Sequence, residues 1–109
     1  MNPKREVLTH LATMAKAFAH PNRLELLELV AQGERSVEAL AQVAGLTIGN
    51  TSQHLQQLRR SGLLATRRQG KQIFYRLADD AVVDMLVALR RIAEHNVADV
   101  QRVLDGYFH

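Results

Sequence analysis

The fold is most readable in one stretch, Leu46-Thr-Ile-Gly-Asn-Thr-Ser-Gln-His-Leu-Gln-Gln-Leu-Arg-Arg60. If this stretch is a helix beginning after Thr47, then Thr51, Leu55 and Leu58 form its apolar side at helical spacing. The opposite side is rich in amides and has no acidic residue. Gln and Asn side chains offer a donor and an acceptor together, which a base edge in the major groove requires. We therefore interpret the stretch as a recognition helix; the alternative is an ordinary solvated helix face.

Length and composition indicate one domain, residues 1–109, with enough apolar residues (47%) for a small core. The sequence has no cysteine, which excludes disulfides, thiolate metal sites and thiol-based sensing. No apolar run approaches the ~20 residues that span a bilayer. The polar N-terminus shows no signal peptide. We expect a cytoplasmic protein without membrane contact.

The charges are segregated along the chain. The net charge is only +3, but all eleven acids lie in residues 1–38 and 79–109. Residues 39–78 therefore carry +6 and the remainder −3, which predicts a polyanionic partner. A chance cluster on a solvated surface is the alternative. The six basic residues of this segment are Arg59, Arg60, Arg67, Arg68, Lys71 and Arg76.

The first part of the chain predicts two helices. Residues 3–19 carry an apolar stripe at helical spacing, and Pro3 suits a first helical turn. His20 is forced toward extended geometry by the proline that follows it. Pro21 then begins a second helix that is apolar on most sides and stops near Gly33.

Residues 36–61 predict a helix-turn-helix. Ser36 suits the N-cap of a short third helix, and Gly45 supplies the left-handed residue that ends it. Thr47 then caps the helix described above. Two helices joined by a tight glycine turn form the layout in which the second helix enters the major groove.

A β-hairpin and a long helix complete the chain. Residues 63–78 alternate in polarity around Gln69-Gly-Lys71, which predicts a basic wing. Residues 79–106 predict a helix of ~40 Å, capped by Asp79 or Asp80, that is too long for a four-helix core. Its apolar stripe therefore requires a second copy, together with the helix over 3–19. The expected interface residues are Leu8, Leu11, Met85, Leu89, Ile92 and Val100.

Five stretches together are specific to one known family. They are Phe18-Ala-His-Pro-Asn-Arg-Leu-Glu-Leu-Leu27, Ser36-Val-Glu-Ala-Leu-Ala41, Gly45-Leu-Thr47, Thr51-Ser-Gln-His-Leu-Gln-Gln-Leu-Arg-Arg-Ser-Gly-Leu-Leu64 and Arg67-Arg-Gln-Gly-Lys-Gln-Ile-Phe-Tyr-Arg-Leu-Ala78. Through them the chain resembles, over nearly its whole length, the ArsR/SmtB family of dimeric winged-helix repressors. The resemblance implies a mainly α fold with a small β-hairpin, about five helices plus a two-stranded wing. It also implies dimerisation through the first and last helices, and operator binding.

The chain departs from the family at its metal sites. Ser36 and Glu38 stand where the family's thiolate ligands would be, and the last-helix zinc pattern has no match. His95 and Asp99 lie four residues apart, with His10 on the neighbouring predicted helix, so they are weak candidates for zinc or nickel. We favour a surface pair and expect no metal or cofactor. The ending Val100-Gln-Arg-Val-Leu-Asp-Gly-Tyr-Phe108 is also similar to members that precede a rhodanese-like domain.

We predict a transcriptional regulator, in the form of a repressor, that binds double-stranded DNA at an inverted-repeat operator as a homodimer; the sequence does not identify its effector. Gly49, Asn50 and Gln53 would face the bases, and Ser52 and His54 would bond phosphate. The basic residues of the wing would hold the flanking backbone or minor groove. The alternatives are a dimerisation module that has lost DNA binding, the DNA-binding fragment of a larger rhodanese-fused regulator, or an enzyme. We expect no enzyme, because Ser52 and His54 do not face each other on a helix and the sequence shows no Gly-rich phosphate loop or paired inward carboxylates. The predicted DNA-binding residues are Thr47, Gly49, Asn50, Ser52, Gln53, His54, Gln57, Arg67, Arg68 and Lys71.

Overall fold

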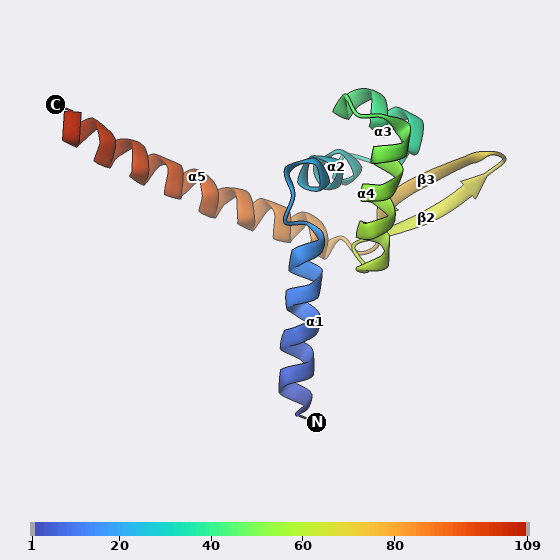
Figure 1. Ribbon diagram of the computed structural model, residues 1–109, viewed down its shortest axis with the longest axis horizontal. Coiled ribbons are helices and arrows are strands. Elements are labelled where there is room, and N and C mark those ends of the chain that lie inside the picture. Colours follow the sequence, from blue (N-terminus) through green and yellow to red (C-terminus); the bar gives the residue numbers. More distant parts are fainter. Residues whose placement is uncertain (1, 109) are drawn as a thin grey trace.

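The computed structural model describes residues 2–108 and confirms a winged helix-turn-helix with five helices (Figure 1). Its elements, in chain order, are α1 (Pro3–Ala17), α2 (Pro21–Ala31), β1 (Arg35–Ser36), α3 (Val37–Ala44), α4 (Ile48–Arg60), β2 (Leu64–Gln69), β3 (Gln72–Leu77) and α5 (Ala81–Phe108).

The ends of the first two helices follow from local side-chain chemistry. Asn2 caps α1 by accepting a hydrogen bond from the Lys4 amide at 3.0 Å. The helix ends at Ala17, two residues before the predicted end. His20 is extended (φ −157°, ψ 132°), as the following proline requires. The His20 imidazole then caps α2, because its Nδ1 accepts from the Asn22 amide at 3.0 Å.

The core lies where α2, α3 and α4 meet. Five leucines with no exposed surface fill it, and each contributes about 1.5–3 kcal/mol by burial. Thr51 is also fully buried, and its hydroxyl donates to the Thr47 carbonyl at 2.8 Å, so the core holds no unpaired hydroxyl there. The leucines are Leu26 and Leu27 of α2, Leu40 of α3, and Leu55 and Leu58 of α4.

The predicted wing is a hairpin of β2 and β3, paired in register from Leu64–Leu77 to Gln69–Gln72. Gly70 begins its two-residue loop with φ 61°, which a type II′ turn requires at that position. The prediction of a two-stranded wing is incomplete. β1 pairs with β3 through Arg35–Tyr75 and Ser36–Phe74, so the sheet has three strands in the order β1-β3-β2.

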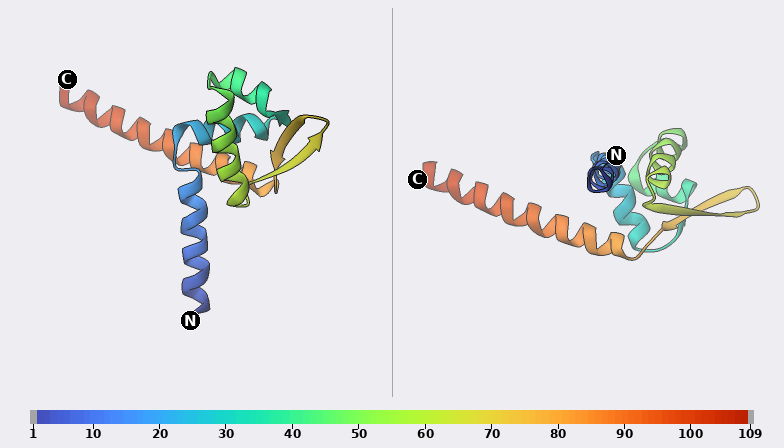
Figure 2. Two further views of the ribbon diagram at one scale, coloured as in Figure 1. Left: turned by 45° about the vertical axis from the view of Figure 1, so that its right-hand side comes forward. Right: turned by 90° about the horizontal axis from the view of Figure 1, so that it is seen from below.

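The two terminal helices leave the body in different directions (Figures 1 and 2). The Cα radius of gyration is 17.0 Å, against about 13 Å for a compact chain of this length. The solvent-accessible surface of 7923 Å² exceeds the roughly 6,100 Å² expected for a compact 12.2 kDa chain. Within residues 2–108, no helix is long and apolar enough to cross a membrane.

Large apolar side chains cover the exposed parts of both arms. α5 begins at Ala81, after Asp79 caps it, and continues past the predicted end at Gly106 to Phe108. Its 28 residues extend ~42 Å at 1.5 Å per residue. The exposed apolar residues of the arms are Val7, Leu8, Leu11, Val87, Leu89, Ile92, Val97, Val100, Val103, Leu104 and Tyr107.

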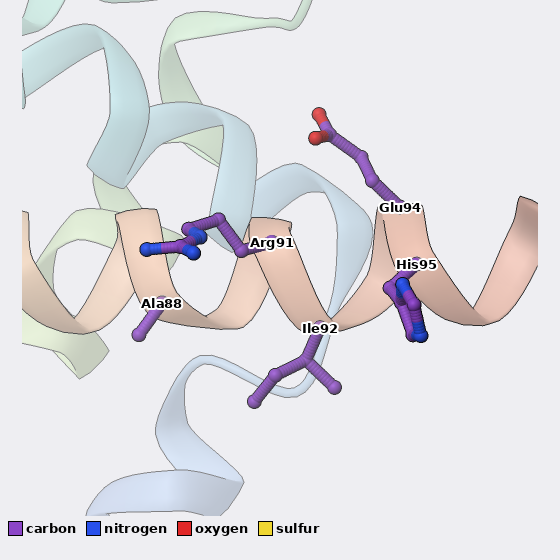
Figure 3. Close-up of a pocket in the computed structure, with 5 residues that line it drawn as sticks. All are labelled: Ala88, Arg91, Ile92, Glu94 and His95. Carbon is purple, nitrogen blue, oxygen red and sulfur yellow. The ribbon is translucent and has the colours of Figure 1, made fainter.

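Five of the six residues expected at a dimer interface are among these exposed side chains. Met85 differs, because it packs against the core of its own chain. Ala88, Ile92 and His95 project from one side of α5 and Glu94 from the other (Figure 3). Together with Arg91 they line an open hollow. This hollow presents the 68%-exposed Ile92 for packing by another helix.

Candidate nucleic-acid interface

The turn between α3 and α4 fixes the position of the predicted recognition helix. Gly45 ends α3 in the left-handed conformation (φ 68°), and the Leu46 amide donates to the Ala41 carbonyl at 3.0 Å. Thr47 caps α4 by accepting from the Asn50 amide at 3.1 Å. The Thr47 hydroxyl is therefore already used within the chain.

The outward face of α4 presents the residues predicted to read bases. Gly49, Asn50 and Gln53 are all exposed. A Cβ added at Gly49 would meet nothing within 4 Å, so this position leaves open space beside the helix. Leu55 and Leu58 anchor the opposite face in the core. The helix is thus held firmly by its apolar side while its amide side faces outward.

One flank of α4 faces the wing. Gln56 donates to the Ser52 hydroxyl at 3.0 Å, so Ser52 is oriented along the helix. A groove of about 390 Å³ separates this flank from the sheet. Burial raises the pKa of Tyr75 there, partly opposed by the Arg59 charge. The groove is lined by Gln56, Arg59, Arg60, Thr66, Arg68, Ile73 and Tyr75.

The wing carries three residues that are predicted to contact the DNA backbone, and they differ in exposure and pairing. Arg68 and Lys71 are exposed near the loop. Arg67 instead donates to Glu34 from Nε at 3.0 Å and Nη2 at 2.6 Å, and its guanidinium lies 4.7 Å from the Phe74 ring centroid. The hydrogen bond from Arg67 lowers the pKa of Glu34, and the same contact raises the pKa of Arg67. Glu34 therefore neutralises one wing charge.

The other flank of α4 faces the start of α2. Arg23 Nη1 donates to Gln57 Oε1 at 3.1 Å and lies 3.5 Å from His54 Nδ1. The His20 and His54 rings lie 4.9 Å apart. Sequence reasoning named His54 and Gln57 but missed Arg23 and His20. The polar run His20-Pro-Asn-Arg23 at an otherwise apolar helix was the available signal.

The metal candidates do not converge on one point. His95 Nε2 lies 3.6 Å from Asp99 Oδ2, and Asp99 also pairs with Arg102. His10 lies on α1, which runs away from α5 (Figure 1). Among residues 2–108, no three His, Asp or Glu side chains group closely enough to hold a metal ion. His95 and Asp99 thus form a surface pair in this chain.

Comparison with known proteins identifies the family. Residues 18–67 match a family model described as a helix-turn-helix domain. The biofilm growth-associated repressor of Agrobacterium fabrum is 44% identical, over 77% of this chain and 72% of the repressor. The homodimeric winged helix-turn-helix DNA-binding domain of Mb0332 from Mycobacterium bovis, a possible ArsR-family regulator, superposes with a TM-score of 0.81. It is 36% identical over 86% of this chain and 87% of that one. The chain belongs to the ArsR family of winged helix-turn-helix transcriptional regulators.

This ArsR-family chain is accordingly a regulator and not an enzyme. A longer relative is the HTH-type transcriptional regulator Rv0324 of Mycobacterium tuberculosis, which is 38% identical over 89% of this chain but only 43% of its own length. The names of these relatives mention no sulfur-handling domain, so the expected link to a rhodanese-like domain stays a prediction.

Proposed function

We propose that this chain is a sequence-specific transcriptional repressor that binds an inverted-repeat DNA operator as a homodimer. The observation that carries the proposal is the exposed, acid-free amide face of α4, set beside a basic wing. Amides suit base edges in the major groove, and cations suit the phosphates on either side of it. In this proposal residues 1–109 act as one DNA-binding and dimerisation domain.

The predicted residues divide into base readers and backbone contacts. Asn50 and Gln53 read base edges, while Gly49 lets the DNA approach the backbone of α4. Ser52, His54 and Gln57 lie on the flanks of the helix, where phosphates border the groove. Arg68 and Lys71 hold the backbone near the wing, and Arg67 joins them only when a phosphate displaces Glu34. Thr47 supports the set by capping the helix.

The exposed arms supply the dimer. The surface excess of about 1,800 Å² per chain, taken from the observed and expected areas above, is large enough for a stable interface. We infer that Leu8, Leu11, Leu89, Ile92 and Val100 are buried there, with Met85 supporting α5 from the core side. A two-fold dimer would place the recognition helices about 34–36 Å apart, one DNA turn.

The chain offers no cysteine for a thiol-based response. We infer that this domain binds its operator without a metal or other cofactor and that the signal comes from elsewhere. That source would be a fused or separate sulfur-handling partner, or a small molecule at the dimer interface. The site of action is the cytoplasm, where operator DNA is available.

The test is an electrophoretic mobility shift with DNA from the region upstream of the chain's own gene. We expect a discrete complex that survives excess mixed-sequence competitor. A footprint with two half-sites one turn apart would support the dimer geometry. Equal loss of the complex to specific and mixed-sequence competitors would contradict sequence-specific recognition, and absence of any complex would favour a protein-interaction module.

A further inference from the structure

The junction between α2 and α4 contains a group of polar side chains that we name the α2–α4 cluster: His20, Arg23, His54 and Gln57. Arg23 contacts His54, 31 residues away in the sequence, and donates a hydrogen bond to Gln57, 34 residues away. Arg23 is at the centre, with Nη1 directed at both Gln57 and His54. The cluster therefore ties the start of α2 to the exposed part of the recognition helix.

The positive charge in this cluster is uncompensated. Among residues 2–107, no carboxylate lies within ion-pair distance of Arg23, and Arg23 Nη2 makes no hydrogen bond. Arg23 Nε is buried and has no hydrogen-bond partner. A half-buried cation with an unsatisfied donor costs free energy unless an anion or acceptor reaches it. This arrangement is typical of a site that is completed by a ligand.

The surroundings of His54 show the same deficit of negative charge. Burial lowers the pKa of His54 below its ordinary value, and His20 and Arg23 lower it further. The groups that face this imidazole are His20 from the link before α2, Arg23 from α2 and the neutral Gln57 from α4. None of them is acidic. An anion placed here would favour the charged imidazole and so raise its pKa.

The position of the cluster indicates which anion it meets. A helix lying in the major groove has one phosphate backbone on each side. On α4, Gln56 and Arg59 face the wing, whereas His54 and Gln57 lie on the opposite flank. Lys16 and Arg60 border that opposite flank in a second hollow. Both flanks of the recognition helix therefore carry basic side chains, with Arg60 bordering both.

We propose that Arg23 and His54 form a binding site for a phosphodiester of the DNA strand that passes α4 on the side away from the wing. Arg23 donates through its free Nη2. The phosphate also stabilises the protonated imidazole of His54, whose Nδ1 then no longer accepts from Arg23 Nη1. Gln57 holds the guanidinium in place. The proposal rests on the proposed function, because it places operator DNA against α4.

The first experiment measures binding of a labelled mixed-sequence duplex of about 30 base pairs by fluorescence anisotropy at several salt concentrations. A phosphate contact is independent of sequence and contributes about 0.9 to the log–log salt slope, so two protomers contribute about 1.8. Arg23→Gln should flatten the slope by that amount. The matched control is Arg102→Gln, which removes an exposed arginine of α5 and should leave the slope unchanged. A purely structural role for Arg23 would weaken binding without changing the slope.

The second experiment follows affinity between about pH 8 and pH 6 at fixed salt, using His54→Gln. Because binding raises a lowered pKa, the wild type should take up protons and bind more tightly as the pH falls. The variant should lose most of this dependence, whereas the control His10→Gln should keep it. If circular dichroism shows that Arg23→Gln does not fold, the result for His54→Gln decides the proposal.

Four outcomes would overturn the site. An unchanged salt slope in folded Arg23→Gln, or an unchanged pH dependence in His54→Gln, would remove it while DNA binding by the wild type still supports the proposed function. No DNA binding by the wild type would remove both. Finally, inorganic phosphate added at constant ionic strength should leave the NMR signal of His54 unchanged, and a saturable shift would identify a free-anion site instead of a DNA contact.

Discussion

Replacing Glu34 with Gln should strengthen DNA binding, although Glu34 lies outside the recognition helix. Its carboxylate accepts two hydrogen bonds from Arg67, and Arg67 Nη1 donates to Gln69 at 2.7 Å. The same guanidinium is stacked on Phe74. Glutamine keeps an oxygen that can accept a hydrogen bond but removes the negative charge. Arg67 therefore stays in place on the wing with its charge no longer neutralised.

The expected change in the salt slope follows from the charges of residues 39–78, the segment without acidic residues. Six basic residues lie in residues 39–78, and Glu34 neutralises one of them. Five available cations of this segment per protomer, or ten per dimer, contribute at most about −9 to the wild-type salt slope. Releasing Arg67 adds two contacts per dimer and should steepen the slope by up to about 1.8.

The assay is the salt dependence of operator affinity by fluorescence anisotropy. Glu25→Gln is the matched control, because it changes the net charge equally at an exposed position of α2. We expect a steeper slope for Glu34→Gln only, and the wild-type slope or less when Arg67→Gln is added to it. Equal slopes for Glu34→Gln and Glu25→Gln would show that Arg67 makes no phosphate contact, and the reasoning would be wrong.

Three further predictions concern the dimer, base recognition and the signal. Ile92→Asp should give a monomer in sedimentation at micromolar concentration, because it places a charge on the apolar arm; a wild type that is already monomeric would contradict the dimer. Gln53→Ala should cost about 1–3 kcal/mol on the operator and relax preference at one base pair, whereas Arg68→Ala should weaken all sequences alike. Identical specificity profiles for the two variants would refute this division. Peroxide should leave operator affinity unchanged, and zinc should change it by less than tenfold, about 1.4 kcal/mol; release by zinc that His95→Ala abolishes would make the His95–Asp99 pair a sensor.

The elements with local signals could be predicted from the sequence. The caps Ser36 and Thr47 accept hydrogen bonds from the amides three residues ahead of them, as their positions indicated. Gly45 and Gly70 have the left-handed conformations that the turns required. In these cases the residue type and its immediate neighbours are sufficient, because the stabilising contact spans only a few residues.

Features that depend on distant contacts could not be predicted. The two residues of β1 are too few for a periodic pattern, and only the position of β3 makes them a strand. Glu34 and Arg67 are 33 residues apart, so the sequence analysis predicted an unpaired charge at Arg67. The contacts of Arg23 could not be predicted for the same reason, since its partners lie on α4. Met85 fits the apolar stripe of α5 whether it packs against the core of its own chain or against a second chain, so the sequence pattern could not separate the two.

Because α1 and α5 point in different directions, most of α5 is exposed to proteases unless a second chain covers it. After Arg90, which pairs with Glu28, nearly every residue of α5 is exposed in a single copy. Such a segment opens at little cost and is where a protease cuts first, while the winged core stays closed. Pairing removes that vulnerability by mass action. We therefore expect a protease to cut unpaired chains within α5 first, and to spare this helix at concentrations at which the chains pair.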